Sequence, residues 1–270
     1  MGKHKYKPLM QKLKKALLPR SKFMPASDME RHRDALAEIY RSRFGLSLHP
    51  LQTSPSVVPP ADLIDNVQGR NKSDLNTFFG SGFRSTLNII ELLQAHGYDI
   101  TNMDRMLDFG VGVGRVLLQF LPFRMERHGC DVNPVAVDWT AKALGEHATL
   151  RISDPEPPLP YDNGVFDMAL ALAVFVHIPV NQQGKWVAEL GRIVKPGGCV
   201  IGTTHDISRM ETAGKKVDWS ETGVDRGLHM NSYLTPAKLK EIWAPAFDIL
   251  EIRRYPGQQT HFIARRTALA

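Results

Sequence analysis

The sequence has 270 residues, of which 43% are hydrophobic and 23% are charged. This composition is ordinary for a folded protein and excludes a collagen-like or wholly disordered chain, and a chain of this length can bury a core without a disulfide or a metal. The two cysteines, Cys130 and Cys199, are too few for a disulfide framework or a zinc cage, so a reducing compartment such as the cytoplasm is expected. Apolar runs stay shorter than 18 residues, so we expect no membrane-spanning helix.

The positive charge is concentrated at the N-terminus. The net charge is +6, yet the first 20 positions hold seven lysines and arginines and no acidic residue, so the rest of the chain is close to neutral. Nucleic acid is therefore not an expected partner, because a basic footprint over a whole domain is missing. Within residues 1–20, Leu9, Leu13 and Leu17 have helical spacing. A basic amphipathic helix of this kind can lie on an anionic membrane surface or dock on a protein, and a solvated, frayed terminus is the alternative.

Two helices are predicted before residue 100. Ser27 and Glu30 have the spacing of a capping box, which predicts a helix that begins after Ser27 and ends at Gly45. A second run of apolar residues at helical spacing stops near Gly97. Between the two, residues 47–61 contain four prolines and little periodicity, which indicates a linker or an ordered arm.

From about residue 103, short apolar strands alternate with amphipathic helices. This alternation predicts an α/β fold, a doubly wound, mostly parallel seven-stranded sheet with helices on both faces and a helical N-terminal extension. Residues 1–75 would then form the tail, helix and Pro-rich arm, and residues 76–270 the main domain, with a polar insertion at about 207–232 as a lid. The expected strands are 106–109, a second that ends at 131, 149–152, 166–172, 199–203, 247–252 and 261–264. One helix is expected directly after the glycines of residues 110–114, and three more at 134–144, 182–193 and 236–243. Ligands of such sheets bind beyond the carboxyl ends of the strands.

A glycine-rich loop follows the first expected strand. Gly110, Gly112 and Gly114 suit a sharp turn that a ligand approaches closely, and amides at the start of a following helix would favour an anionic group; a tight strand-to-helix turn is the structural alternative. Asp131 lies at the expected end of the second strand, where a carboxylate can accept both hydroxyls of a ribose or, alternatively, cap a helix. Loop and acid together predict a ligand that contains a nucleoside.

The residues around the loop distinguish between nucleosides. The dinucleotide fingerprint needs a third glycine at position 115, where this chain has Arg115. Asp108 would add negative charge beside a pyrophosphate, whereas it suits a positive ammonium group. S-adenosyl-L-methionine has a ribose, an adenine, an ammonium and a carboxylate, and it matches each of these demands.

Five motifs in order, over about residues 83–266, resemble the class I S-adenosylmethionine-dependent methyltransferases. They are the D-x-G-x-G-x-G loop, the acid after the second strand, the acid after the third, the lead into the fourth strand with a following His-Ile pair, and the E-L-x-R-x-x-K-P-G-G segment at 189–198. The resemblance implies that the methionine part of the cofactor is wrapped by the first motif, its ribose held by Asp131 and its adenine amino group contacted by Asp154. The residues of the first motif are Asp108, Phe109, Gly110, Gly112 and Gly114.

Two features depart from patterns of the wider family. Val176 stands where many members have Glu before the histidine, which puts an acid-assisted role there in doubt. The segment 171–174 is aliphatic and lacks the D/N/S-P-P-Y/F/W signature of enzymes that methylate amino groups of nucleic-acid bases. The sequence therefore disfavours methylation of DNA bases.

The acceptor side is less defined. His177, after the fourth strand, and His205, after the fifth, are candidate general bases, with a structural role as the alternative for each. His229 and Tyr233, in and after the polar insertion, and Arg84, on the helix before the first motif, are candidates for closing over the ligands. The polar content of the insertion favours a polar small-molecule or glycan-like acceptor, and no metal site is expected.

The leading hypothesis is therefore a methyltransferase that acts by in-line displacement. The alternatives are a non-catalytic cofactor-binding scaffold subunit that docks through its basic arm, and an RNA methyltransferase that uses this arm to bind phosphates. An NAD-dependent oxidoreductase is disfavoured by Arg115.

Overall fold

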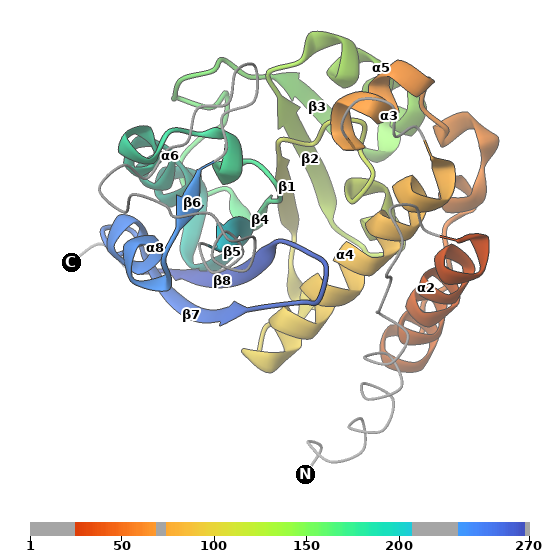
Figure 1. The fold of residues 1–270 in the computed structure, drawn as a ribbon. Coiled ribbons are helices and arrows are strands. Elements are labelled where there is room, and N and C mark those ends of the chain that lie inside the picture. Colours follow the sequence, from red (N-terminus) through yellow and green to blue (C-terminus); the bar gives the residue numbers. More distant parts are fainter. Residues whose placement is uncertain (1–24, 69–73, 207–231, 268–270) are drawn as a thin grey trace, which may run out of the picture.

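The computed structural model describes residues 25–68, 74–206 and 232–267 (Figure 1). The basic N-terminal segment, residues 207–231 of the predicted lid and the candidate His229 lie outside these ranges. In the described part of the chain, no helix combines the length and the apolar character needed to cross a membrane.

The predicted doubly wound sheet is confirmed. Its strand order is β3-β2-β1-β4-β5-β8-β7, and a two-residue strand, β6, pairs with the end of β5. Only β8 runs antiparallel to its neighbours β5 and β7, so the sheet is mostly parallel. The strands are β1 (Arg105–Phe109), β2 (Glu126–Asp131), β3 (Thr149–Ile152), β4 (Phe166–Ala171), β5 (Val194–Asp206), β6 (Tyr233–Leu234), β7 (Phe247–Arg253) and β8 (Thr260–Arg266).

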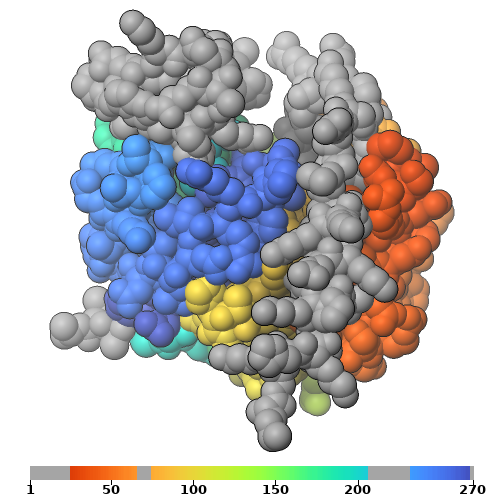
Figure 2. All heavy atoms as spheres, turned by 60° about the horizontal axis from the view of Figure 1, so that its bottom comes forward, coloured from red at the N-terminus to blue at the C-terminus, as the bar shows by residue number. Residues whose placement is uncertain are grey.

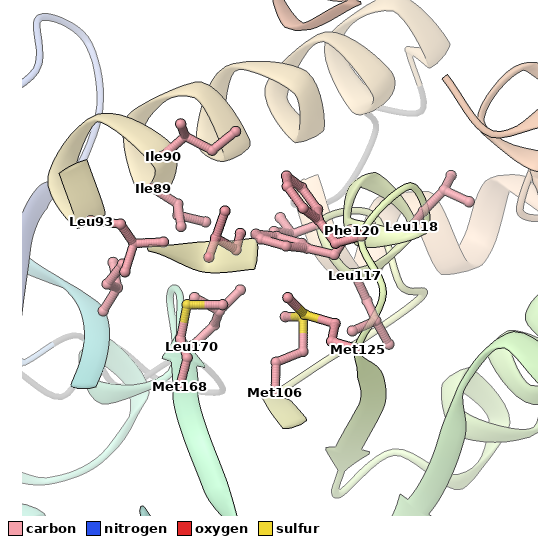
Figure 3. Packing of buried hydrophobic residues seen from close by; sticks show 14 of the residues in the cluster. Ile89, Ile90, Leu93, Met106, Leu117, Leu118, Phe120, Met125, Met168 and Leu170 are labelled. Carbon is pink, nitrogen blue, oxygen red and sulfur yellow. The ribbon is translucent and has the colours of Figure 1, made fainter. Parts of the chain in front are cut away.

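Helices cover both faces of the sheet because its central strands carry apolar side chains on both sides. On one face, Met106, Met168 and Leu170 pack against α4 (Leu75–Ala95), as Figure 3 shows. On the other face, Leu107 and Phe109 pack against α6 (Val180–Ile193) and α8 (Pro236–Trp243). α5 (Pro134–Leu144) packs on β2 and β3, and Leu63 and Ile64 of the short α3 (Ala61–Gln68) share a cluster with Phe78 of α4 and Ala136 of α5. The sheet is therefore buried on both faces, and its carboxyl edge is left for a ligand.

Two local predictions are wrong. No α-helix follows the glycine loop: residues 117–120 form a single 3-10 turn, η5 (Leu117–Phe120), whose four side chains are all buried. A segment that is buried on all sides, with even Gln119 hydrogen-bonded in the interior, lacks the exposed polar face that a surface helix needs. The capping box is also absent, because the helix predicted there, α2 (Ala26–Ile39), begins two residues earlier, with Pro25 in place of Ser27 at the N-cap and no side-chain cap.

The N-terminal elements share the core of the main domain. α2 continues into a π-helical turn that ends at Gly45, as predicted, and the Pro-rich arm forms two short 3-10 helices. Leu36 and Tyr40 are fully buried in the cluster that also contains Met106 of β1, and the Tyr40 hydroxyl donates to the carbonyl of Gln119. Figure 2 shows α2 (red-orange) on one side of this face and the C-terminal strands (blue) against α4 (yellow).

Candidate functional site

A cavity of about 410 Å³ lies at the carboxyl edge of the sheet. Its size is within the usual range for small-molecule sites. The lining comes from the loop after β1, the end of β2, the loops after β3 and β4, and α6. The lining residues are Asp108, Phe109, Gly110, Val111, Gly112, Val113, Arg115, Val116, Asp131, Val132, Ser153, Pro155, Leu172, Ala173, Val174, His177, Ile178 and Trp186.

The glycine loop lies in close contact with the segment after β4. Gly110 has a φ of +78°, and a Cβ atom there would lie 2.4 Å from Cγ2 of Val174. Only glycine avoids both the left-handed strain and this collision. The loop amides are already engaged: those of Gly110 and Val111 donate to the carbonyl of Cys130, and that of Gly114 to the carbonyl of Val111. The expectation of a free anion-binding helix start is therefore wrong.

Asp131 fixes the loop to the second strand. One of its carboxylate oxygens accepts from the amide of Gly112 at 2.8 Å, and the other accepts from the amide of Asn133 at 2.9 Å. The helix cap predicted as an alternative role for Asp131 belongs instead to Asn133, whose side chain accepts from the amides of Val135 and Ala136. The Asp131 carboxylate is thus held in one orientation at the wall of the cavity.

Asp108 is buried near the end of β1, and the half-buried Arg115 follows in the loop after it. Asp108 is only 4% exposed, and its burial raises its pKa to about 7, against the opposing effect of Arg115. Burial lowers the pKa of Arg115 to about 10, and its guanidinium donates to the hydroxyl of Ser81 at 2.5 Å. At this position the cavity offers a carboxylate whose charge is poorly solvated, so a positive group on a ligand would stabilise it.

The segment after β4 is held in a strained conformation. Ala173 has a φ of +58°, and its amide donates to the hydroxyl of Thr203 on β5 at 2.7 Å. That hydroxyl donates in turn to the side-chain oxygen of Gln259 at 2.6 Å. Strain of this kind persists where surrounding contacts enforce it, often next to a functional site. The next turn, η7 (Phe175–His177), brings His177 to the cavity.

Comparisons with known proteins agree with this arrangement. Residues 107–202, from β1 into β5, match a family model described as a methyltransferase domain. This match agrees with the resemblance to the class I S-adenosylmethionine-dependent methyltransferases that the motifs carry. No protein with a curated description matches the sequence.

Several solved structures share the methyltransferase fold. The PH0226 protein of Pyrococcus horikoshii OT3 is 17% identical, with a TM-score of 0.55, and the match covers 68% of this chain and 91% of that one. The magnesium protoporphyrin IX methyltransferase of Synechocystis PCC 6803 is 14% identical, with a TM-score of 0.54 and coverage of 87% and 100%. The 1,6-didemethyltoxoflavin-N1-methyltransferase of Burkholderia thailandensis is 21% identical, with a TM-score of 0.53 and coverage of 70% and 79%. At these identities, the likeness shows the fold.

Most of the predicted cofactor-binding residues, and the candidate base His177, lie together at the cavity. Asp108, Phe109, Gly110, Gly112, Asp131 and His177 line the cavity. Gly114 lies just behind it, where a Cβ atom would be 2.8 Å from the methyl group of Thr140. Asp154 is exposed after β3 and is not part of the lining; the preceding residue, Ser153, lines the cavity instead.

The other acceptor-side candidates lie apart from the cavity lining. His205, at the end of β5, stacks on Tyr233 of β6 with ring centroids 5.0 Å apart. Arg84 lies on α4, close enough to Arg115 to lower its pKa. These three side chains therefore do not join the cavity residues in the described part of the chain.

Several cavity residues of this methyltransferase fold were not predicted. The buried hydroxyl of Ser153 has no hydrogen-bond partner, although it lines the cavity. Trp186 packs its ring on Phe109 at 4.9 Å, and the sequence indicated for it only a place on the apolar face of α6. The position of Ser153 directly before Asp154 was the one available signal, whereas Trp186 carried none beyond its helical spacing.

Proposed function

We propose that this chain binds S-adenosyl-L-methionine in the cavity and transfers its methyl group to a polar small-molecule or glycan-like acceptor. The observation that carries the proposal is that one cavity is lined by the glycine loop, by Asp131, which accepts a hydrogen bond from the loop amide of Gly112, and by the buried carboxylate of Asp108. The cavity thereby combines a close backbone surface, an acceptor for hydroxyl groups and a site for a positive group.

The residues present fit the cofactor. The backbone of Gly110 and Gly112 lines the cavity without a side chain, which suits close contact with the methionine chain. Asp108 suits the ammonium group, and Asp131 keeps lone pairs for the ribose hydroxyls beyond the two amides that it accepts from. The unpartnered hydroxyl of Ser153, together with Asp154, is suited to the polar edge of the adenine.

The chemistry follows from orientation. The bound cofactor supplies a methyl group on a sulfonium, which is already activated for displacement. The task of the chain is then to hold the acceptor atom in line and exclude water, which can contribute about 7–11 kcal/mol. His177 lines the cavity and could accept the acceptor's proton, a contribution of about 10²–10⁴-fold where that proton must leave during the reaction.

A pair of aspartate variants tests the proposal. Isothermal titration with S-adenosyl-L-methionine should give micromolar affinity for the wild type and a loss of more than tenfold for Asp131→Ala. Asp138→Ala, which removes an exposed carboxylate from α5, is the matched control and should bind as the wild type does. Equal affinity of Asp131→Ala and the wild type would refute the ribose assignment, and a wild type that binds NADH instead would refute the proposed function.

The acceptor class is tested separately. Incubation with a methyl-labelled cofactor and fractionated metabolite extracts should label polar small molecules or glycans. Label that appears only in RNA would favour the RNA methyltransferase, and a chain that binds the cofactor without labelling anything would favour the non-catalytic scaffold.

A further inference from the structure

Two glutamine side chains are buried in a largely apolar part of the core. Gln52, in the short helix η2 (Pro50–Thr53) of the Pro-rich arm, is 2% exposed, and Gln119, in η5, is fully buried. The chain neighbours of Gln119, Leu118 and Phe120, belong to the apolar cluster shown in Figure 3. A buried amide is costly unless it is hydrogen-bonded, so the partners of these two amides define their role.

Three hydrogen bonds connect the Pro-rich arm to the glycine loop. The backbone amide of His49 donates to Oε1 of Gln52 at 2.6 Å. Nε2 of Gln52 donates to Oε1 of Gln119 at 2.8 Å, and Nε2 of Gln119 donates to the carbonyl of Arg115 at 3.3 Å. Each glutamine thus accepts at its oxygen and donates at its nitrogen, which fixes the orientation of both side-chain amides.

The carbonyl at the end of this chain of hydrogen bonds belongs to the cavity wall. Arg115 lines the cavity, and its guanidinium donates to the hydroxyl of Ser81 on α4. Its carbonyl also lies against α4, since a Cβ atom on Gly82 would be 2.8 Å from the carbonyl oxygen. The end of the glycine loop is therefore held by α4 and by the side chain of Gln119.

Other contacts hold the arm and the backbone of Gln119 in place. The hydroxyl of Tyr40 donates to the main-chain carbonyl of Gln119, and burial raises the pKa of this hydroxyl, so it keeps its proton. Val57 of the arm is buried in the same apolar cluster as Tyr40. Because these contacts do not involve the glutamine amides, the particular contribution of the amides is their connection to the carbonyl of Arg115.

We propose that Gln52 and Gln119 are positioning residues for the methyl donor, and that the Pro-rich arm acts through them on the end of the glycine loop. The proposal rests on the proposed function, because the donor would lie along this loop. Neither glutamine is among the cavity-lining residues, so both act through the carbonyl of Arg115. Binding groups need to be held within about 0.5 Å of their productive positions by the residues behind them, and the two glutamines supply such support.

Methionine substitutions remove the amides with little change in side-chain size. The test variants are Gln52→Met, Gln119→Met and the double variant, and Gln94→Met, at an exposed position of α4, is the matched control. Isothermal titration measures the affinity for S-adenosylhomocysteine, and urea unfolding measures stability. Gln119→Met should weaken binding by about fivefold or more, Gln52→Met should weaken it less, and the control should bind as the wild type does.

The double variant separates positioning from stability. Gln52→Met leaves the buried Oε1 of Gln119 without its donor and should lower the urea midpoint, whereas the double variant removes both partners and should regain part of that loss. The carbonyl of Arg115 still lacks its donor in the double variant, so its affinity should stay at the level of Gln119→Met. Compared with Gln52→Met, the double variant should therefore be more stable and bind more weakly.

Two results overturn the positioning role. One is that all variants bind S-adenosylhomocysteine as the wild type does; the other is that affinity follows the urea midpoint from variant to variant, which indicates a purely structural role. If Gln119→Met does not fold, Gln52→Met decides alone: it supports the role by binding more weakly than Gln94→Met, and equal binding overturns the role.

Hydrogen exchange of the ligand-free chain distinguishes this proposal from the proposed function. A wild type that does not bind S-adenosylhomocysteine refutes the proposed function. The amides of residues 110–116 should then still exchange faster in Gln52→Met and Gln119→Met than in the wild type and Gln94→Met, because the loop has lost its support. Equal exchange in all four proteins would show that the two glutamines do not hold the loop.

Discussion

At the scale of single residues, the burial of the Asp108 carboxylate raises its pKa and so determines which ligand charge it can bind. Its pKa of about 7 means that the free protein holds a proton there through much of the acidic range. A ligand with an ammonium group favours the ionised form, so binding requires the loss of that proton below pH 7. The affinity for such a ligand should therefore depend on pH through the titration of Asp108 and not through a group of the ligand.

We predict that affinity for S-adenosylhomocysteine falls as the pH is lowered from 7 to 5, by up to about tenfold per pH unit. The cause is competition between the proton and the ammonium group for Asp108. Asp108→Asn cannot titrate and should bind weakly with little pH dependence over this range. Isothermal titration at pH 5, 6, 7 and 8 measures both, and a flat profile for the wild type would contradict the assignment of Asp108.

A second prediction at this scale concerns Gly110. Gly110→Ala should destabilise the fold by more than Gly197→Ala does, although the two glycines have nearly equal φ values, +78° and +79°. Nothing lies within 4 Å of a Cβ atom added at Gly197, so alanine there should cost only the left-handed strain, about 1–2 kcal/mol. The excess at Gly110 should shrink when Val174→Ala is added, as a double-mutant cycle by chemical denaturation would show. Equal costs for the two alanine variants would mean that the loop does not press on the segment after β4.

At the scale of elements, sequence patterns predicted those segments whose ends carry their own signal. α5 and α8 have the predicted bounds because a proline opens each of them, and β3 lies between clear turns. The segment after the glycine loop was predicted as a helix and is η5, because its burial on all sides depends on α2, α4 and β1 packing around it. Local sequence does not encode that packing.

The same limit applies to the site. Asp108 and Asp131 were predictable because each follows a strand at a fixed place in a motif. Thr203 of β5 acts through a contact with the segment after β4, and no spacing pointed to it. For Ser153 the one signal was its place directly before Asp154.

The contact between α4 and the glycine loop predicts that two glycine-to-alanine substitutions in helices change the stability in opposite directions. Alanine for glycine inside a helix usually stabilises by about 0.5–1 kcal/mol, and Gly184→Ala in α6, where nothing lies within 4 Å, should do so. Gly82→Ala in α4 should destabilise instead, because its Cβ would lie 2.8 Å from the carbonyl oxygen of Arg115. Thermal or urea unfolding measures both, and a Gly82→Ala protein more stable than the wild type would show that α4 does not press on the cavity loop.

At the scale of the whole molecule, the N-terminal elements and the sheet form one hydrophobic unit. Leu36 of α2 is fully buried in the same cluster as β1 and β4. α2 is therefore part of the support for α4, and Ser81 of α4 accepts a hydrogen bond from Arg115 of the cavity lining. Loss of α2 would disturb α4 and, with it, this contact at the cavity.

Leu36→Ala should accordingly lower the stability of the entire chain by about 2–5 kcal/mol in one cooperative transition. Circular dichroism for the helices and fluorescence of the buried Trp186 and Trp243 should report coincident unfolding curves. Two separate transitions in Leu36→Ala would mean that α2 forms a unit apart from the sheet.

Deletion of residues 1–20, in contrast, should leave cofactor affinity intact.

The most direct measurement of the central claim is a crystal structure of the chain grown or soaked with S-adenosylhomocysteine. The ribose hydroxyls should lie against Asp131, the homocysteine chain along Gly110 and Gly112, and the ammonium group at Asp108. An empty cavity at saturating ligand, or the nucleoside bound elsewhere on the chain, would contradict it.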